Sequence, residues 1–409
     1  MVLRKDNGAT SNRVSPALWH GFNGQSSPVR TDGVLPYQSI CTLIERRRIR
    51  SNEPVWESQI QPASLDLRLG PIGYQVRASF LPGSEKSVDR FVEDLTIQTL
   101  DLSKPTVLQK GAVYVIPLME ELALPEDVSG RANPKSTTGR LDLFARLITD
   151  RGVHFDRVPA HYKGKLYVEV APGSFSVVVH AGTTLNQLRF VKGNPASPSD
   201  SDLALQETLV YDADGRPADA TFEDGFWLSV DLAGKVGDEV VGYRAKQNAP
   251  AVDLDQVNYY QPLEYWEPIA APPKSLLILD PGEFYILGSR ERVRVPPRFS
   301  AEMVPYDPSR GEFRVHYAGF FDPGFGYDGP EFKGTRAVLE VRSHEVPCVL
   351  ADGQLVGRLD YEWLLEPSNK VYGINAGSSY QYQGIALSKQ FRDRVKESAE
   401  TVESSLIVE

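Results

Sequence analysis

Cysteine is scarce in this chain of 409 residues, which has only Cys41 and Cys348 and no Cys-x-x-Cys pair. This scarcity excludes a disulfide scaffold and a structural zinc site built on a cysteine pair. No run of about 18 apolar residues occurs, so we expect no membrane-spanning helix and no membrane partner. The N-terminus lacks the apolar segment of a secretory signal, and we therefore expect a cytoplasmic protein.

Positive charge is also in short supply. The chain has 44 Lys and Arg residues against 54 Asp and Glu residues, a formal net charge of −10. Nucleic-acid binding depends on many Lys and Arg contacts to phosphates, so this balance argues against a nucleic-acid partner. A local basic pocket on the acidic molecule could still bind a small anionic ligand.

Several catalytic signatures are missing as well. The chain contains neither H-x-E nor P-C-x-x-C, the pair of motifs found in zinc nucleobase deaminases. It has no G-x-x-x-x-G-K-[ST] phosphate loop and no G-x-S-x-G nucleophile elbow. The six histidines show no H-x-x-x-H spacing, so we expect no metal site and no zinc.

Turn-forming and aromatic residues are abundant. The chain has 33 Gly, 30 Pro, 18 Tyr and 17 Phe residues, a mixture typical of many short strands joined by turns. The length indicates two or three domains. We therefore expect a mostly β protein.

An internal repeat organises the chain. Four pairs of segments match at a constant offset of 171 residues: GAVYVI (111–116) with GEFYIL (282–287), LPEDVSG (124–130) with VPPRFSA (295–301), LYVEV (166–170) with AVLEV (337–341), and AGTTLNQLRF (181–190) with DGQLVGRLDY (352–361). Between the second and third pairs, HFD (154–156) matches FFD (320–322) at an offset of 166. This period is too long for a solenoid, so the pattern predicts a tandem duplication of a whole β domain.

Composition sets the expected boundaries. Polar stretches, a Pro-rich stretch and the repeat together predict five parts: a mobile leader (1–33), β domain 1 (34–245), a linker (246–273), β domain 2 (274–390) and a C-terminal tail (391–409) whose pattern favours a helix. Residues 193–225 look like a long loop or insertion, and residues 36–49 like a short helix.

A cationic turn is the strongest local candidate for a site. RANPKSTTGR (131–140) places Arg131, Lys135 and Arg140 around Ser136, Thr137, Thr138 and Gly139. Hydroxyls, a glycine and several cations together suit a cradle for phosphate. A polar turn with solvated charges explains the same residues equally well.

These motifs resemble the dCTP deaminase and dUTPase superfamily. Residues 135–140 (KSTTGR) look like its Arg-Ser-Ser-x-x-Arg phosphate turn, with Lys in place of the first Arg. Two segments resemble its β-hairpin followed by a Glu-bearing strand: GVHFDRVPAHYKGKLYVEV, with Asp156 and Glu169, and AGFFDPGFG…GTRAVLEV, with Ala318, Asp322 and Glu340. Tyr380 and Gln383 resemble its Tyr-x-x-Gln tail, and the resemblance is closest to long, two-barrel bacterial dCTP deaminases.

The resemblance implies a fold and a reaction. The implied fold is two tandem dUTPase-like, distorted jelly-roll β-barrels with a few short helices, and the implied assembly is a homotrimer. The implied reaction is hydrolytic deamination of dCTP to dUTP and ammonia without zinc, with Mg²⁺ carried by the triphosphate. A glutamate, Glu340 or Glu169, would carry protons between water and the base, the role that a glutamate has beside the metal in zinc deaminases.

The resemblance also implies roles for the other residues. Ser136 would orient the water, and Arg140 would bind phosphate or stabilise developing charge. Asp156 or Asp322 would lie by the sugar, and Tyr380 and Gln383 would close over the triphosphate. Further substrate contacts would come from Arg131, Lys135, Thr137, Thr138, Gly139 and Ala318.

The two repeats are not equivalent. The cationic turn occurs only in repeat 1, whereas repeat 2 has the hairpin closer to the family pattern. We therefore expect one site in which repeat 1 supplies Ser136 and Arg140 and repeat 2 supplies Asp322 and Glu340. A site between copies of repeat 1, using Glu169, is the competing hypothesis, and from the residues alone either glutamate could be an exposed strand residue. A dUTPase-type or bifunctional nucleotide diphosphohydrolase and a non-catalytic nucleotide-binding regulator are the alternative functions.

Overall fold

The computed structural model describes most of the chain. The described residues are 30–199, 202–203, 208–218, 225–234, 240–304, 313–315, 319–329, 331–343, 345–374, 376 and 380–392. Most of the expected leader and almost all of the expected C-terminal tail lie outside these ranges. In the described part of the chain, no helix is long and apolar enough to cross a membrane.

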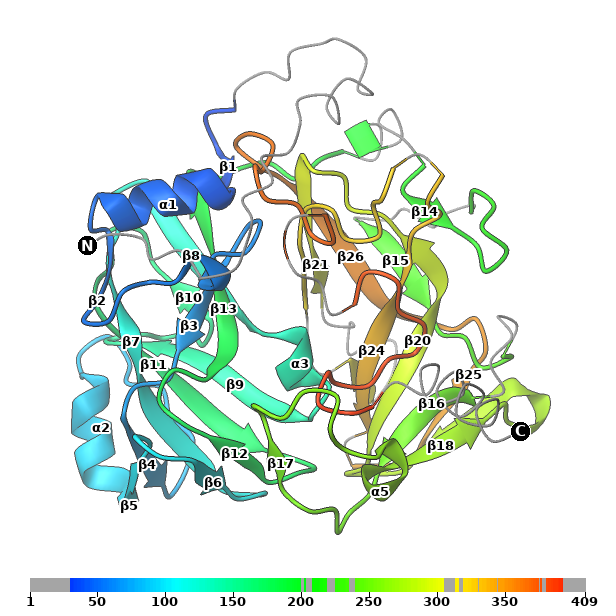
Figure 1. The fold of residues 1–409 in the computed structure, drawn as a ribbon, viewed down its shortest axis with the longest axis horizontal. Helices are drawn as coiled ribbons and strands as arrows, with labels where there is room; N and C mark the ends of the chain where they lie inside the picture. Colours follow the sequence, from blue (N-terminus) through cyan, green and yellow to red (C-terminus); the bar gives the residue numbers. More distant parts are fainter. Residues whose placement is uncertain are drawn as a thin grey trace, which may run out of the picture.

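The first barrel is formed by the N-terminal half (Figure 1). Its strands are β1 (Gly33–Val34), β2 (Ile49–Ser51), β3 (Leu65–Arg68), β4 (Ile72–Val76), β5 (Thr96–Asp101), β6 (Thr106–Leu108), β7 (Val113–Ala123), β8 (Val128–Pro134), β9 (Leu143–Thr149), β10 (Arg157–Val158), β11 (Lys163–Pro172), β12 (Val177–Val179), β13 (Thr184–Lys192) and β17 (Val252–Asp253). They form sheets in the orders β1-β13-β8-β10 with β3 on β13, β5-β4-β7-β11-β9 with β2 on β7, and β17-β12-β6.

The second barrel repeats this plan beside the first (Figure 1). Its strands are β14 (Val210–Tyr211), β15 (Phe226–Ser229), β16 (Val240–Ala245), β18 (Trp266–Ala270), β19 (Leu276–Leu279), β20 (Phe284–Val293), β21 (Phe299–Val304), β22 (Phe313–Val315), β23 (Phe320–Phe321), β24 (Thr335–Ser343), β25 (Cys348–Ala351) and β26 (Leu355–Trp363). The sheet orders are β18-β16-β20-β24-β22 with β14 on β20, β15-β26-β21-β23, and β19-β25.

The strand registers confirm the tandem duplication. Strand β13 pairs with β8 so that Lys192 faces Val128, and β26 pairs with β21 so that Trp363 faces Phe299. Both residues of the second pair lie 171 positions after those of the first. The β7–β11 and β20–β24 pairs correspond in the same way. The mostly β fold of two jelly-roll-like barrels is therefore confirmed.

The boundary between the barrels differs from the expected one. Strands β14, β15 and β16 lie in the region that we expected in domain 1, but they pair with strands of the second barrel. The expected linker (246–273) is also structured, because β17 pairs with β12 of the first barrel and β18 with β16 of the second. The repeats have diverged here: FWLS in β15 takes the place of LDLR in β3, so the match was invisible in the sequence.

In the described part of the chain, helices are few and short. They are α1 (Tyr37–Glu45), α2 (Val88–Leu95), α3 (Ser136–Gly139) and α5 (Pro262–Tyr265), with two 3₁₀ turns, η2 (Glu57–Gln59) and η3 (Pro273–Ser275). Helix α1 confirms the helix expected near residues 36–49, since Ile40, Leu43 and Ile44 lie on one buried face.

Side-chain alternation sets which residues face the gap between the barrels. In β24, Leu339 and Val341 point into the second core, so Val338 and Glu340 point outward. Val338 packs in the hydrophobic cluster of the first barrel. The outer face of β24 therefore lies against the first barrel. On the equivalent face of β11, Tyr167 instead packs under α2.

Candidate active site

A cavity of about 280 Å³ lies between the two barrels. The first barrel contributes the α3 turn and residues of β3 and β13, and the second contributes β23, β24 and the segment that follows β26. The lining residues are Ser58, Gln61, Asp66, Pro134, Lys135, Ser136, Thr137, Gly139, Arg140, Gln187, Met303, Gly319, Phe320, Phe321, Asp322, Phe325, Val338, Glu340, Tyr372, Tyr380, Gln383 and Lys389.

The α3 turn presents its polar side chains because it is a single helical turn after β8. The Lys135 carbonyl accepts hydrogen bonds from the backbone N–H groups of Thr138 and Gly139, at 2.8 and 3.0 Å. This starts the helix at Ser136, whose side chain lines the cavity together with Thr137. Thr138 is on the other side of the turn and is buried away from the cavity.

Arg140 and Glu340 meet inside the cavity although they belong to different barrels. The Nε atom of Arg140 lies 4.0 Å from Oε1 of Glu340, and both side chains are buried. The Arg140 guanidinium also lies 3.7 Å from the ring centre of Tyr380, and its Nη1 donates to the Ala386 carbonyl at 2.9 Å. Burial raises the pKa of Glu340 to about 7, although Arg140 acts in the opposite direction. Near neutral pH, this carboxyl can both accept and return a proton.

Asp322 is a further carboxylate of the cavity, and its side chain is 11% exposed. Burial raises its pKa to about 6, while the guanidinium of Arg189 lowers it. Its Oδ1 atom lies 4.0 Å from Nη2 of Arg189. Among the described residues, Oδ1 has no hydrogen-bond partner. A ligand hydroxyl could therefore donate to it.

The segment after β26 closes over the α3 turn. The Tyr380 hydroxyl lies 3.2 Å from Oγ1 of Thr137 and accepts the backbone N–H of Lys389 at 3.2 Å. Ser388 Oγ donates to the Thr137 carbonyl at 3.0 Å. Gln383 Nε2 donates to the Arg336 carbonyl at 3.1 Å. The segment is thus held across both barrels.

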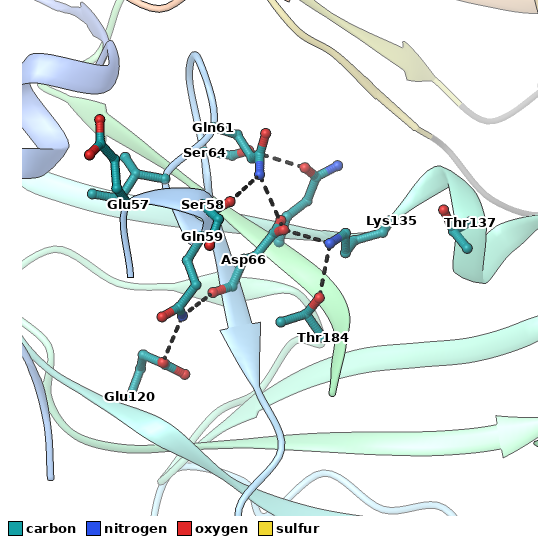
Figure 2. Close-up of polar contacts among 12 residues, drawn as sticks. Glu57, Ser58, Gln59, Gln61, Ser64, Asp66, Glu120, Lys135, Thr137 and Thr184 are labelled. Atoms are coloured by element: carbon teal, nitrogen blue, oxygen red, sulfur yellow. Dashed lines mark hydrogen bonds and ion pairs between the residues drawn. The ribbon is translucent and has the colours of Figure 1, made fainter. Parts of the chain in front are cut away.

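Lys135 and Asp66 form an ion pair at the edge of the cavity (Figure 2). Lys135 Nζ donates to Oδ2 of Asp66 at 2.5 Å and to Oγ1 of Thr184 at 2.9 Å. Gln61 Nε2 donates to the same Asp66 oxygen at 3.3 Å. Burial and the nearby Lys135 lower the pKa of Lys389. Two lysines therefore lie close together beside a single carboxylate, which favours an anionic ligand.

The structure brings together most of the residues selected from the sequence. Nine of them line the one cavity: Lys135, Ser136, Thr137, Gly139, Arg140, Asp322, Glu340, Tyr380 and Gln383. Ala318 lies outside the described residues, although its neighbour Gly319 is part of the lining.

Four selected residues lie elsewhere. Thr138 is buried behind the turn, as described above. Arg131 forms ion pairs with Glu302 and Glu362, whose position across the barrel contact could not be seen from the sequence.

Asp156 and Glu169 lie in the first barrel, away from the cavity. Asp156 accepts the backbone N–H of Leu147 at 2.7 Å. Glu169 accepts from Nη2 of Arg146 at 2.5 Å, and so its carboxylate is already neutralised. Glu169 does not line this cavity, and a site between copies of repeat 1 that uses Glu169 stays a hypothesis.

Sequence reasoning missed several lining residues. Asp66 carried a weak signal, because it is an acidic residue among the alternating leucines of IQPASLDLRLG (60–70). Lys389 follows the Tyr-x-x-Gln tail but has no motif of its own. The others that we had not selected include Ser58, Gln61, Gln187, Phe320 and Tyr372.

Comparisons with known proteins agree with this architecture. Residues 31–194 match the N-terminal domain model of 2'-deoxycytidine 5'-triphosphate deaminase, and residues 199–391 match the C-terminal domain model. The two models meet between residues 194 and 199, which agrees with the placement of β14 to β16 in the second barrel.

Solved and curated relatives point the same way. The crystal structure of 2'-deoxycytidine 5'-triphosphate deaminase from Agrobacterium tumefaciens is 48% identical, with a TM-score of 0.77, and the match covers 82% of this chain and 100% of that one. A dCTP deaminase of Halorubrum lacusprofundi is 28% identical over 45% of this chain and 86% of its own length. A Halobacterium salinarum protein named "dCTP deaminase, dUMP-forming" is 28% identical over 45% of this chain and 85% of its own length. The chain belongs to the dCTP deaminase family.

Proposed function

We propose that this protein hydrolyses the exocyclic amine of dCTP, giving dUTP and ammonia, in the cavity between its two barrels. One observation carries the proposal. A buried glutamate with a pKa near 7, Glu340, shares this cavity with Arg140 and the Ser136 turn. Family membership supplies the substrate class, and the cavity supplies groups that suit it.

The proposed chemistry uses Glu340 as a proton shuttle. Water attacks C4 of the cytosine ring, and its proton passes to the Glu340 carboxylate. The carboxyl returns this proton to N3. It then takes the second proton from the new hydroxyl on C4 and passes it to the amine of the tetrahedral intermediate. The C4–N4 bond then breaks, ammonia leaves, and the water oxygen stays on C4. The balance is dCTP and water to dUTP and ammonia. We propose that no zinc takes part, because the sequence lacks the zinc deaminase motifs.

The neighbouring groups have supporting roles in this proposal. Ser136 orients the water, and Arg140 stabilises negative charge that develops near Glu340. Asp322 accepts a hydrogen bond from the sugar. Lys135 and Lys389 bind the triphosphate, and Mg²⁺ enters as part of the substrate, held chiefly by phosphate oxygens and water.

A second candidate activity is the release of pyrophosphate in addition to ammonia. Two of the curated relatives, from Halobacterium salinarum and Methanosphaera stadtmanae, are named "dCTP deaminase, dUMP-forming". In this variant, water would attack the α-phosphate after or during deamination.

A product assay tests both candidates. Purified protein is incubated with dCTP, dUTP or dCMP, and ammonia and pyrophosphate are measured in parallel. We expect ammonia from dCTP, and none from dUTP. Equal amounts of pyrophosphate and ammonia from dCTP would favour the dUMP-forming variant. Binding of dCTP without either product would contradict the proposal and favour a non-catalytic nucleotide-binding regulator.

A further inference from the structure

Arg189 of the first barrel is fully buried at the contact with the second barrel. Its guanidinium touches three consecutive residues of the hairpin that lines the cavity. It lies 4.0 Å from the ring centre of Phe320, its Nη2 donates to the Phe321 carbonyl at 3.5 Å, and the same atom lies 4.0 Å from Oδ1 of Asp322. One side chain of β13 therefore supports the whole segment that carries Asp322.

Further charges hold Arg189 in place. Its Nη1 donates to Oε2 of Glu362 at 2.9 Å and to the Ala301 carbonyl at 3.2 Å. The other oxygen of Glu362 accepts from Arg131, and Arg131 Nη1 lies 3.2 Å from Glu302. A buried guanidinium is costly without such partners. These ion pairs form a continuous chain from the edge of the barrel contact to Asp322.

The residues of this ion-pair series carry different charges at equivalent positions of the two repeats. Arg131 and Glu302 are 171 residues apart and therefore occupy equivalent strand positions. At the position equivalent to Arg189, the second barrel has Asp360. The Phe320–Asp322 hairpin of the second barrel contacts Arg189 of the first barrel. If it packed against the second barrel of another copy instead, Asp322 would lie near Asp360, and the two carboxylates would repel each other. The charges therefore favour packing of this hairpin on a first barrel.

We propose that Arg189 is a positioning residue, which holds the Phe320–Asp322 segment and keeps Asp322 ionised as the acceptor for the substrate's sugar hydroxyl. This inference rests on the proposed function, because that function supplies the substrate. Asp322 acts on the ligand, whereas Arg189 acts only through Asp322 and its hairpin.

Among the charged groups that act on Asp322, Arg189 contributes most to lowering its pKa. Burial raises the pKa of Asp322, and the Asp66 carboxylate on β3 raises it further. Arg189 and, more weakly, Lys370 lower it. Tyr372, whose own pKa is raised chiefly by burial, also interacts electrostatically with this carboxylate. Removing Arg189 leaves Lys370 as the one cation that acts on Asp322 among the described residues, so the pKa must rise.

The test measures dCTP binding rather than turnover. The reference is Glu340→Gln, which removes the cavity carboxyl whose pKa is raised to about 7 and blocks the proposed reaction. Calorimetry gives the dissociation constant of Mg·dCTP from below pH 6 to above pH 7. Ionisation of the nucleotide phosphates affects every variant alike. In the reference, we expect binding to weaken as the pH falls through about 6, where Asp322 takes up its proton.

Three further substitutions, each made in the Glu340→Gln protein, test the role of Arg189. With Arg189→Gln, we expect the pH at which binding is half lost to rise by about one unit, because the opposite charge is gone. Arg189→Lys keeps the charge and should keep the reference pH dependence, with weaker binding because Lys lacks the guanidinium fork. Arg131→Gln, the matched control from the same ion-pair chain, should leave the pH dependence unchanged. Melting temperatures show that each variant is folded.

The possible outcomes separate the two claims. If Arg189→Gln and Arg131→Gln both lower the melting temperature but leave the pH dependence of binding unchanged, Arg189 is merely structural and the inference is wrong. If Arg189→Gln does not fold, Arg189→Lys still tests the inference, since an unchanged affinity would contradict it. If the reference itself fails to bind dCTP, the proposed function is contradicted and the inference fails with it.

Discussion

At the residue scale, burial is the main cause of the raised pKa of Glu340. The carboxyl is buried, and the guanidinium of Arg140, with Nε 4.0 Å from Oε1, only partly offsets this burial, so the pKa is raised to about 7. Glu169 occupies the equivalent position of the first repeat but receives a close ion pair from Arg146. The same residue type therefore has a raised pKa in the second barrel and a close positively charged partner in the first.

This difference predicts how activity depends on pH. In the proposed mechanism, Glu340 must be ionised to take a proton from water, and burial raises its pKa to about 7. We therefore expect kcat/KM for dCTP to fall as the pH drops below about 7, with a further loss below about 6 as Asp322 is protonated. Steady-state ammonia release measured across this range checks the prediction. A kcat/KM that stays flat through both values would count against it.

Individual site residues could be predicted only where a motif carried them. Ser136, Arg140, Asp322 and Glu340 stand in recognisable local patterns, and all four line the cavity. Arg131 shares the same cationic segment, yet it points to carboxylates far along the chain. Such a partner depends on how the barrels pack, which no local pattern records.

At the element scale, the segment 380–389 acts as a clasp across α3. Tyr380 stacks on Arg140 and contacts the Thr137 hydroxyl. Four strands of each barrel were predictable because their hydrophobic alternation is shared at a fixed offset. Strand β14 was not predictable, because it lies in the polar stretch 193–225 that looks like an insertion. Strand β15 was not predictable either, because its sequence FWLS has diverged from LDLR in β3.

We expect substitutions of two tyrosines in this segment to differ in their effect on KM. Tyr380→Ala removes the ring that packs on Arg140, an interaction of about 0.5–2 kcal/mol, and we expect KM for dCTP to rise by roughly threefold to thirtyfold. Tyr382 is 65% exposed on the same segment, and Tyr382→Ala is the matched control. Kinetics of ammonia release at a fixed pH compare the two. Equal effects of both substitutions would show that the clasp has only a general structural role.

At the scale of the whole molecule, the two barrels form one site because their contact is asymmetric. The outer face of β24 packs on the first barrel, whereas α2 covers the equivalent face of β11. Ion pairs cross the contact, among them Arg342 with the buried Asp142. The duplication could be predicted from the sequence, but the barrel boundary could not. A homotrimer stays a prediction.

We expect loss of the inter-barrel ion pair between Arg342 and Asp142 to lower stability more than loss of an exposed ion pair. Arg342→Ala leaves the buried Asp142 carboxylate without its arginine, and we expect a loss of about 1–3 kcal/mol in the free energy of unfolding. The control is Arg90→Ala, which removes an exposed pair with Glu93 on α2 and should cost less than about 0.5 kcal/mol. Chemical denaturation measures both. A loss for Arg342→Ala no larger than that for Arg90→Ala would contradict a stabilising role for this contact.

The central claim is that the chain has one deaminase site, with the proton shuttle in the second barrel. The most direct test is ammonia release from dCTP by Glu340→Gln and Glu169→Gln, each checked for folding by its melting temperature. We predict that Glu340→Gln loses at least about a hundredfold in kcat, because general acid–base catalysis contributes that much or more. Glu169→Gln should keep turnover within a few-fold of the original protein. Full activity of Glu340→Gln, or loss of activity only in Glu169→Gln, would contradict the account.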